Sequence, residues 1–212
     1  DIIKMKYPET EKFSDRIMND AERIRDIIDQ TLKFSRLGNE DVVCLDLGNF
    51  IEDVTLYVKR TLMKWNDIPF EVEVKNQLYH IHINPVHLEQ VFINVLRNAV
   101  EAVEDINGGK IRFTGESMDD VVEFRVEDNG HGIPEEAKER IFSEYFTTKH
   151  SGTGLGLTIV KSLVESYNGS IRFESEKDVG TAFIIRFPMF HDCESNIRVK
   201  EENAAGDAEE TD

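Results

Sequence analysis

Apolar and polar residues first alternate at a helical spacing, between residues 13 and 37. Ile17, Ala21, Ile24 and Ile28 are separated by four, three and four positions, so they share one face of a helix between charged positions. This alternation of steps of four and three favours packing against partner helices, although a helix in a globular core has the same pattern. The sequence therefore predicts one long amphipathic helix in this part of the chain.

Beyond residue 40 the apolar pattern changes to short runs, most of them with a period of two, and to helical stretches between them. Six runs predict strands, at residues 70–74, 78–83, 110–115, 121–127, 170–175 and 181–187. Helical patterns occur at 47 to about 65, at about 86–104, at 135–142 and at 155–167. Strands interleaved with helices in this way predict an α+β fold, a two-layer sandwich in which helices cover one face of a sheet.

These patterns divide the chain of 212 residues into three parts. Residues 1–40 form a helical part, residues 41–190 an α+β domain, and residues 191–212 a polar tail without periodicity. We expect the tail to be disordered, because its eight acidic and two basic residues leave little apolar surface to bury.

The formal net charge of −17 argues against partners that need a basic surface. Nucleic acid and anionic lipid both bind to such a surface, so we expect no nucleic-acid binding and no direct membrane contact from this segment. No stretch approaches the roughly 20 apolar residues of a membrane span, which predicts a cytoplasmic location, either as a cytoplasmic protein or as the cytoplasmic part of a membrane-bound sensor. Cys44 and Cys193 have no metal-like spacing and are expected to be two free thiols.

Two asparagines share one face of the helix that is predicted to begin near Pro85. Asn94 and Asn98 lie four positions apart, away from the apolar stripe of the same helix. Such a pair is often no more than two surface amides. An amide oxygen is also a hard ligand that suits Mg²⁺, an ion that takes few protein ligands and completes its shell with phosphates and water.

A predicted strand runs directly into an aspartate and two glycines in the segment VEDNGHGIP, at residues 126–134. Asp-Asn-Gly is common turn chemistry and by itself requires no function. A carboxylate fixed at a strand end, Asp128, can also accept a hydrogen bond from an exocyclic amine such as that of adenine. Gly130 and Gly132 would let the backbone approach a flat base closely.

A third candidate is the segment HSGTGLGL, in which Gly152, Gly154 and Gly156 lead straight into a helix. The backbone N–H groups of such a loop and the positive end of a helix dipole suit a phosphate group. The pattern is neither a Walker A loop nor a Rossmann fingerprint, because the Gly-Lys-Ser/Thr sequence and an immediately preceding strand are absent. The segment before it, KERIFSEYFTTK, fits a mobile lid whose Lys149 could reach phosphates.

Taken in order, these segments resemble the nucleotide-binding boxes of the GHKL ATPase superfamily, and specifically those of sensor histidine kinases. HLEQVFINVLRNAVEA is similar to the asparagine box, EDNGHGIP to the first glycine box, IFSEYFTTK to the phenylalanine box and GTGLGL to the second glycine box. GTAFIIRFP, at residues 180–188, is similar to the terminal strand of the family. Each motif is weak alone, and five of them in sequence are specific.

The resemblance implies an ATP-binding α/β sandwich and a role for each candidate residue. Asn98, with Asn94 beside it, would hold Mg²⁺, and Asp128 would bind the adenine amine with Thr181 supporting that end. The second glycine box, which includes Thr153 and Leu155, would cradle the phosphates.

The segment ERIRDIIDQTLKFSRL, at residues 22–37, resembles the second helix of the hairpin through which these kinases dimerise and which carries their phosphoacceptor histidine. The resemblance therefore implies a homodimer through a helical bundle. All six histidines of this chain lie beyond residue 79, so none takes the place of the phosphoacceptor, and truncation is our preferred explanation. Smaller departures are Asn84, where Asp is common, and Ser-Glu-Tyr in the lid, where Glu-Pro-Phe is more usual.

Three functions remain as alternatives. A kinase module would transfer the γ-phosphoryl group of ATP to a histidine outside this chain, for relay to the aspartate of a response-regulator receiver domain. An ATPase of the gyrase, mismatch-repair or chaperone type would need the general-base Glu that those families place where Asn94 stands, so we expect very slow hydrolysis. A pseudokinase would bind ATP without transferring phosphate.

Overall fold

The computed structural model describes residues 42–62, 68–76, 80–149 and 152–190. The helix predicted over residues 13–37, the hairpin assignment of residues 1–40 and the acidic tail at 191–212 lie outside the described residues. The described residues all belong to the domain that the sequence predicts at 41–190.

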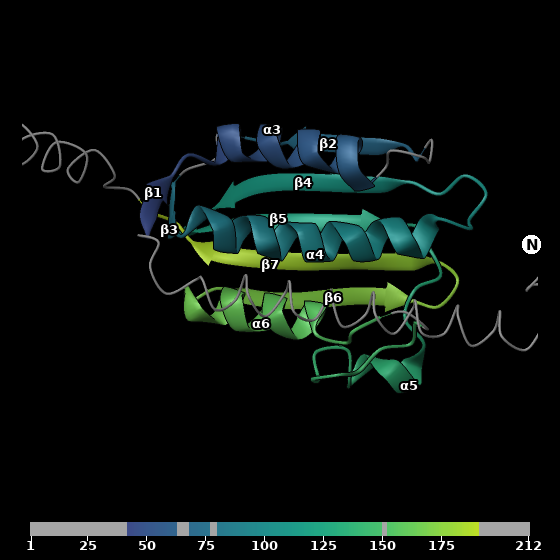
Figure 1. Ribbon diagram of the computed structural model, residues 1–212. Coiled ribbons are helices and arrows are strands. Elements are labelled where there is room, and N and C mark those ends of the chain that lie inside the picture. The colour runs from purple at the N-terminus through teal and green to yellow at the C-terminus, as the bar shows by residue number, and fades with distance from the viewer. Residues whose placement is uncertain (1–41, 63–67, 77–79, 150–151, 191–212) are drawn as a thin grey trace, which may run out of the picture.

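A five-stranded mixed sheet forms the centre of this domain, with the strand order β2-β4-β5-β7-β6 (Figure 1). β2 is parallel to β4, and every other pair is antiparallel. The bounds are β2 Phe70–Val74, β4 Ile111–Met118, β5 Val121–Asp128, β6 Ser170–Glu176 and β7 Gly180–Pro188. All five strands were predicted within a few residues, because alternating apolar positions mark a sheet that is buried on one face.

A separate two-stranded sheet joins β1, Val43–Leu45, to β3, Ile81–Ile83, in antiparallel register. Of the strand predicted at 78–83, the described part thus forms β3 from Ile81 onward. The sequence pattern did not predict β1, since three residues are too few to show a period. Cys44, in the middle of β1, is disulfide-bonded, so the expectation of a free thiol at this position is wrong; Cys193 lies outside the described residues.

Helices cover one face of the large sheet, as predicted (Figure 1). They are α3 Leu47–Tyr57, which continues into the π-helical turn η1 Val58–Leu62, then α4 Pro85–Val103 and α6 Gly156–Ser166. The short α5, Glu135–Lys138, lies beyond the β6 edge of the sheet (Figure 1). α5 is shorter than the predicted 135–142, because a succession of turns follows Glu139.

Asn84 begins α4 in the same way as the aspartate expected there would have done. Its side-chain oxygen accepts hydrogen bonds from the backbone N–H groups of Val86 (2.8 Å) and His87 (3.4 Å), and Pro85 occupies the first helical position. Asn and Asp are about equally good at this position. The departure from the family pattern therefore leaves the start of the helix intact.

The hydrophobic core lies between α4 and the sheet. Phe92 of α4 is fully buried, and its ring centroid lies 5.2 Å from that of Phe113 on β4 and 4.9 Å from that of Phe124 on β5. Burying each such ring contributes about 1.5–3 kcal/mol, and the tilted ring pairs add to this. The core thus holds α4 against the middle of the sheet and fixes the face of α4 that carries the two asparagines.

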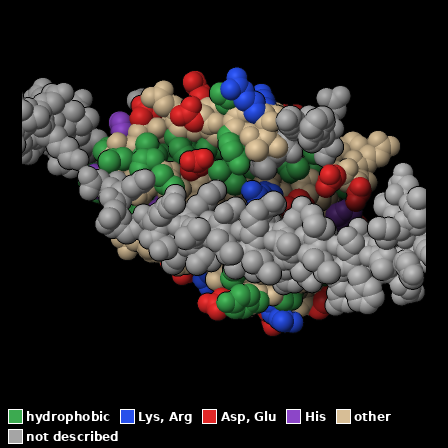
Figure 2. Space-filling view, in the orientation of Figure 1, with side chains coloured by type: hydrophobic (Ala, Val, Ile, Leu, Met, Phe, Trp, Pro, Cys, Tyr) green, Lys and Arg blue, Asp and Glu red, His purple; other side chains and the backbone are tan. Residues whose placement is uncertain are grey.

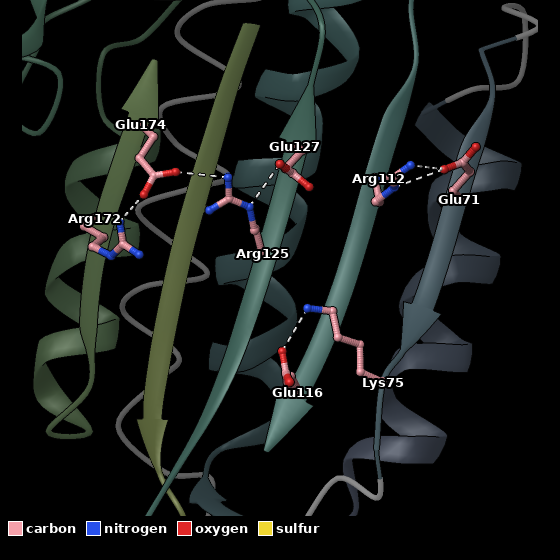
Figure 3. A network of polar contacts seen from close by, with 8 residues as sticks. All are labelled: Glu71, Lys75, Arg112, Glu116, Arg125, Glu127, Arg172 and Glu174. Atoms are coloured by element: carbon pink, nitrogen blue, oxygen red, sulfur yellow. Dashed lines mark hydrogen bonds and ion pairs between the residues drawn. The ribbon is translucent and has the colours of Figure 1, made fainter. Parts of the chain in front are cut away.

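The opposite face of the sheet is polar and carries a network of charged side chains (Figure 3). Two ion pairs join β2, or the residue after it, to β4, namely Glu71–Arg112 and Lys75–Glu116. Arg125 of β5 pairs with Glu127 on its own strand and, across β7, with Glu174 of β6, which also pairs with Arg172 on β6. Most of these groups are well exposed to solvent, so the pairs add little to stability. Alternation of these charges with buried apolar residues explains why the strands show a period of two.

Candidate functional site

A cavity of about 420 Å³ opens between α4, α6 and the ends of β5 and β7. Ten of the twelve residues predicted from sequence line this one cavity, although they are spread over almost 90 positions of the chain. They are Asn94, Asn98, Asp128, Gly132, Lys149, Gly152, Thr153, Gly154, Gly156 and Thr181. Gly130 and Leu155 lie next to lining residues but do not line the cavity themselves.

The two asparagines project from α4 into the cavity. Asn94 is only 6% exposed, and its side-chain nitrogen has no hydrogen-bond partner in the structure. A buried polar group without a partner costs about 1–3 kcal/mol, so this amide is a strong candidate to contact a ligand. The side-chain oxygen of Asn98 accepts a hydrogen bond from Nζ of Lys149 at 3.3 Å and thus already faces a positive charge.

Asp128 stands at the last position of β5, beside Thr181 of β7. Its carboxylate accepts hydrogen bonds from the backbone N–H groups of Gly130 (2.9 Å) and Thr181. Burial raises the pKa of this carboxyl, and the two backbone hydrogen bonds partly oppose that increase. The group is therefore held rigidly at one end of the cavity with lone pairs left to accept a further hydrogen bond.

The glycines of the first glycine box are required by contacts within the protein itself. Gly132 has φ +65, and a Cβ added there would overlap the carbonyl oxygen of Glu176. A Cβ at Gly130 would overlap the carbonyl group of Ala102 in α4. These glycines let the loop after β5 pack closely against α4 and the β6–β7 turn, which positions Asp128.

The second glycine box joins the lid segment to the start of α6. Gly154 has φ +70, and a Cβ there would overlap the backbone of Tyr145. Leu155 is the N-cap of α6 and provides no side-chain hydrogen bond. The first backbone N–H groups of the helix can therefore donate hydrogen bonds to a ligand. Since Gly156 and Leu157 line the cavity, this helix start lies where an anion would be bound.

Lys149 connects the lid segment to α4. Its ammonium group binds the side-chain oxygen of Asn98 and forms an ion pair with the carboxylate of Glu101. Glu101 and Arg97 also line the cavity and were not predicted from sequence. Their spacing gives a signal that could have found them, because Asn94, Arg97, Asn98 and Glu101 follow one ridge of α4 at steps of three and four.

A second hollow, of about 330 Å³, lies between α3 and α4. Hydrophobic side chains gather over these helices in Figure 2, and acidic side chains interrupt them. Asp46, Asp53 and Glu89 are the charged residues of its lining, so it offers a polyanion no cation. Of these two hollows, the cavity beside Lys149 suits a phosphorylated ligand better.

Comparison with known proteins identifies relatives for this domain. A family model described as histidine kinase-, DNA gyrase B- and HSP90-like ATPase matches residues 83–191. The signal transduction histidine-protein kinase AtoS of Escherichia coli is 33% identical over 174 residues, and sporulation kinase A of Bacillus subtilis is 31% identical over 188 residues. These matches cover 82% and 88% of this chain but only 28% and 30% of the relatives. The chain thus spans less than a third of their length.

Solved structures with the same fold are also histidine kinases. The nucleotide-free catalytic domain of histidine kinase ThkA is 36% identical with a TM-score of 0.62, covering 70% of this chain and 96% of that domain. ThkA in complex with the response regulator protein TrrA is 31% identical with a TM-score of 0.66, and the match covers 85% of this chain and 52% of that one. Full-length ShkA in complex with AMPPNP is 26% identical with a TM-score of 0.67, and the match covers 85% of this chain and 39% of that one. The α+β sandwich predicted from sequence is thereby confirmed as the fold of histidine kinase catalytic domains.

Two properties of the described residues bear on membrane insertion and metal binding. None of the helices in this part of the chain is long and apolar enough to cross a membrane. Groups of three or more His, Cys, Asp or Glu arranged to hold a metal ion are likewise absent from it.

Proposed function

Because the chain belongs to the family of histidine kinase-, DNA gyrase B- and HSP90-like ATPases, we propose that it is the ATP-binding catalytic part of a sensor histidine kinase. The observation that carries this proposal is the convergence of the four nucleotide boxes on one cavity. The boxes supply a buried carboxylate at one end and an uncapped helix start with a lysine at the other.

In this proposal the two ends of the cavity bind the two ends of ATP. Asp128, with Thr181 beside it, accepts a hydrogen bond from the adenine amine when its carboxyl group is ionised. Burial raises the pKa of Asp128, so ionisation requires a higher pH than for an exposed aspartate. The start of α6 and the ammonium group of Lys149 bind the phosphates. A net charge of −17 would otherwise repel a polyanion, so these local donors decide where it binds.

Asn98 and Asn94 fit the Mg²⁺ ion that such a nucleotide carries. The Asn98 oxygen faces a cation in the present structure, and the buried Asn94 amide lacks a partner for its nitrogen. A half-turn of that amide exchanges its nitrogen and oxygen, so Asn94 can present either atom to a ligand. When bound, Mg²⁺ would neutralise phosphate charge and orient the phosphoryl group.

The transfer step moves the γ-phosphoryl group from ATP to an imidazole nitrogen of a histidine outside this chain. The lone pair of the unprotonated imidazole nitrogen forms a phosphorus–nitrogen bond as the bond from phosphorus to the β,γ-bridging oxygen breaks and ADP leaves. The other ring nitrogen then releases its proton to solvent. The residues of the cavity contribute by holding the donor in line with the acceptor and excluding water. Relay to the aspartate of a receiver domain would follow, as the solved complex of ThkA with a response regulator suggests for this chain.

The choice of kinase over hydrolase rests on Asn94. An amide cannot take a proton from water, so the residue that faces the phosphates from this turn of α4 is no general base. Glu101 is the carboxylate nearest along the same ridge, and its charge is paired with Lys149. We therefore predict very slow hydrolysis of ATP by the isolated chain, measured as phosphate release; rapid turnover would favour the ATPase alternative.

A phosphotransfer assay tests the proposal directly. This chain is mixed with γ-labelled ATP, Mg²⁺ and a longer product of the same gene that carries the hairpin and the inactivating substitution Asn98→Asp. We expect acid-labile phosphohistidine on the longer chain. Absence of label both in this mixture and when the hairpin is joined to the active domain would contradict kinase activity and, if ATP still binds, favour the pseudokinase alternative.

The same proposal includes a homodimer formed through the hairpin and a cytoplasmic location, where ATP and receiver domains are found. The similarity to dimerising histidine kinases supports the first, because the match to full-length ShkA covers 85% of this chain and extends beyond the isolated catalytic domain. Sedimentation of the chain with its hairpin would test the dimer, which should persist when nucleotide is removed.

A further inference from the structure

One serine contacts three segments at the end of the cavity that is proposed to bind the adenine base, which we call the base end, although the serine does not line the cavity itself. Ser175 lies on β6, opposite Thr181 in the register of β6 and β7. Its hydroxyl oxygen accepts a hydrogen bond from the backbone N–H of Ile133 at 2.8 Å and lies 3.0 Å from the carbonyl oxygen of Gly180. It also lies 2.9 Å from the hydroxyl oxygen of Thr181. Three segments around the proposed adenine position thus meet at one side chain.

The count of protons at this point fixes the direction of the hydrogen bonds. A serine hydroxyl has one proton and two lone pairs. The carbonyl oxygen of Gly180 can only accept, so the Ser175 proton goes to it. The contact between the two hydroxyl groups must then use the proton of Thr181, which Ser175 accepts. All three contacts of Ser175 are satisfied in this arrangement and in no other.

The hydroxyl of Thr181 is left with lone pairs alone. Thr181 lines the cavity and is almost fully buried, so this hydroxyl cannot exchange its partner freely with bulk water. Asp128, its neighbour across β5 and β7, is also an acceptor when ionised. The base end of the cavity therefore presents two acceptors and no side-chain donor from this pair.

We propose that Ser175 is a positioning residue for base selection, which holds the Thr181 proton away from the cavity and so favours a 6-amino purine over a 6-oxo purine. An amino group carries two N–H donors and matches two acceptors. A carbonyl in the same place would direct its lone pairs at the lone pairs of Asp128 and Thr181. This inference rests on the proposed nucleotide binding and adds the residue that sets the polarity of the base end.

The test compares ADP with IDP, which differ in the 6-substituent and in the proton that the 6-oxo base carries on N1; both nucleotides meet the same N1 surroundings in each variant. Dissociation constants for ADP and IDP, each with Mg²⁺, are measured by calorimetry on the whole chain and on its Ser175→Ala variant. Removal of Ser175 frees the Thr181 proton to turn toward the cavity, where it can donate to the carbonyl of IDP. The preference for ADP is the dissociation constant of IDP divided by that of ADP. We expect this ratio to fall by about five- to tenfold in Ser175→Ala, which corresponds to one hydrogen bond.

A matched control exists on the same strand. Ser170→Ala makes the same chemical change at an exposed position of β6 that pairs with Arg186, far along the strand from Thr181. It should leave both dissociation constants unchanged. Ser175→Thr keeps a hydroxyl at the critical position and should restore most of the preference.

A double-mutant cycle separates this role from general support of the loop. Thr181→Val removes the hydroxyl through which Ser175 is proposed to act, so Ser175→Ala should not narrow the preference further in that background. If Ser175→Ala weakens ADP and IDP by the same factor, its role is structural and the proposal is overturned. Should that variant fail to fold, an unchanged preference in Thr181→Val would overturn it instead.

Nucleotide binding and base selection can be contradicted separately. Wild-type chain that binds neither nucleotide would contradict the proposed function and this inference together. Wild-type chain that binds ADP and IDP equally well would contradict the inference alone, and nucleotide binding would stand.

Discussion

At the scale of single residues, the proposed role of the buried Asp128 carboxylate predicts that nucleotide binding depends on pH. Burial raises its pKa, and the ionised form would be the stronger acceptor for the adenine amine in the proposed binding mode. As the pH falls through this raised pKa, the affinity for ADP should fall, at a higher pH than for an ordinary aspartate. Calorimetric titrations between neutral pH and about pH 4 would measure it, since an ordinary Asp has a pKa of about 3.9.

The control is Asp128→Asn, which should weaken ADP binding by about 10- to 100-fold at neutral pH through loss of a hydrogen bond to a charged group. Its remaining affinity should lack the pH step. Without nucleotide, this carboxyl should lower the free energy of unfolding as the pH rises, whereas it should raise the affinity for ADP over the same pH range. A pKa that is raised in the folded state contributes stability at low pH, and that contribution is lost as the pH rises through the folded-state pKa. A pH step that persists in the variant would exclude Asp128 as its source.

At the scale of elements, Lys149 links the lid segment to α4 through Asn98 and Glu101. Glu101→Gln removes the ion pair and should release Lys149 for the phosphates. We expect faster hydrogen exchange of the backbone amides in residues 142–149. ADP affinity should rise by less than about fivefold, because the pair is partly exposed and such pairs contribute little.

Glu89→Gln provides the comparison for that variant. It makes the same charge change on α4, but Glu89 lines the hollow between α3 and α4. In Glu89→Gln, the backbone amides of residues 142–149 should exchange hydrogen at the same rates as in the wild-type chain. Lid amides that exchange at the wild-type rate in Glu101→Gln would show that the ion pair does not restrain the segment.

The elements also show how far the sequence alone can go. Period-two alternation predicted β2, β4, β5, β6 and β7, and the 3.6-residue pattern predicted α4 and α6, because each of these buries one face in the same core. β1 carries too few residues for a period and was not predicted, whereas the helix predicted at 135–142 forms only over Glu135–Lys138 as α5. Ten predicted site residues were placed in one cavity because they belong to local motifs, whereas Ser175 contacts Ile133 and Thr181 only after β6 pairs with β7.

At the scale of the whole molecule, the cavity walls come from α4, the ends of β5 and β7, the lid segment and α6, so a bound nucleotide contacts only the folded state. A ligand at about 100 times its dissociation constant raises the free energy of unfolding by about 2.7 kcal/mol. For a domain of this size we expect ADP with Mg²⁺ to raise the Tm by about 5–10 °C. Differential scanning calorimetry at several ADP concentrations measures this shift, which should grow with the logarithm of concentration and shrink in Asp128→Asn. A Tm that ignores ADP in the wild-type chain would mean that the converging motifs do not form a nucleotide site.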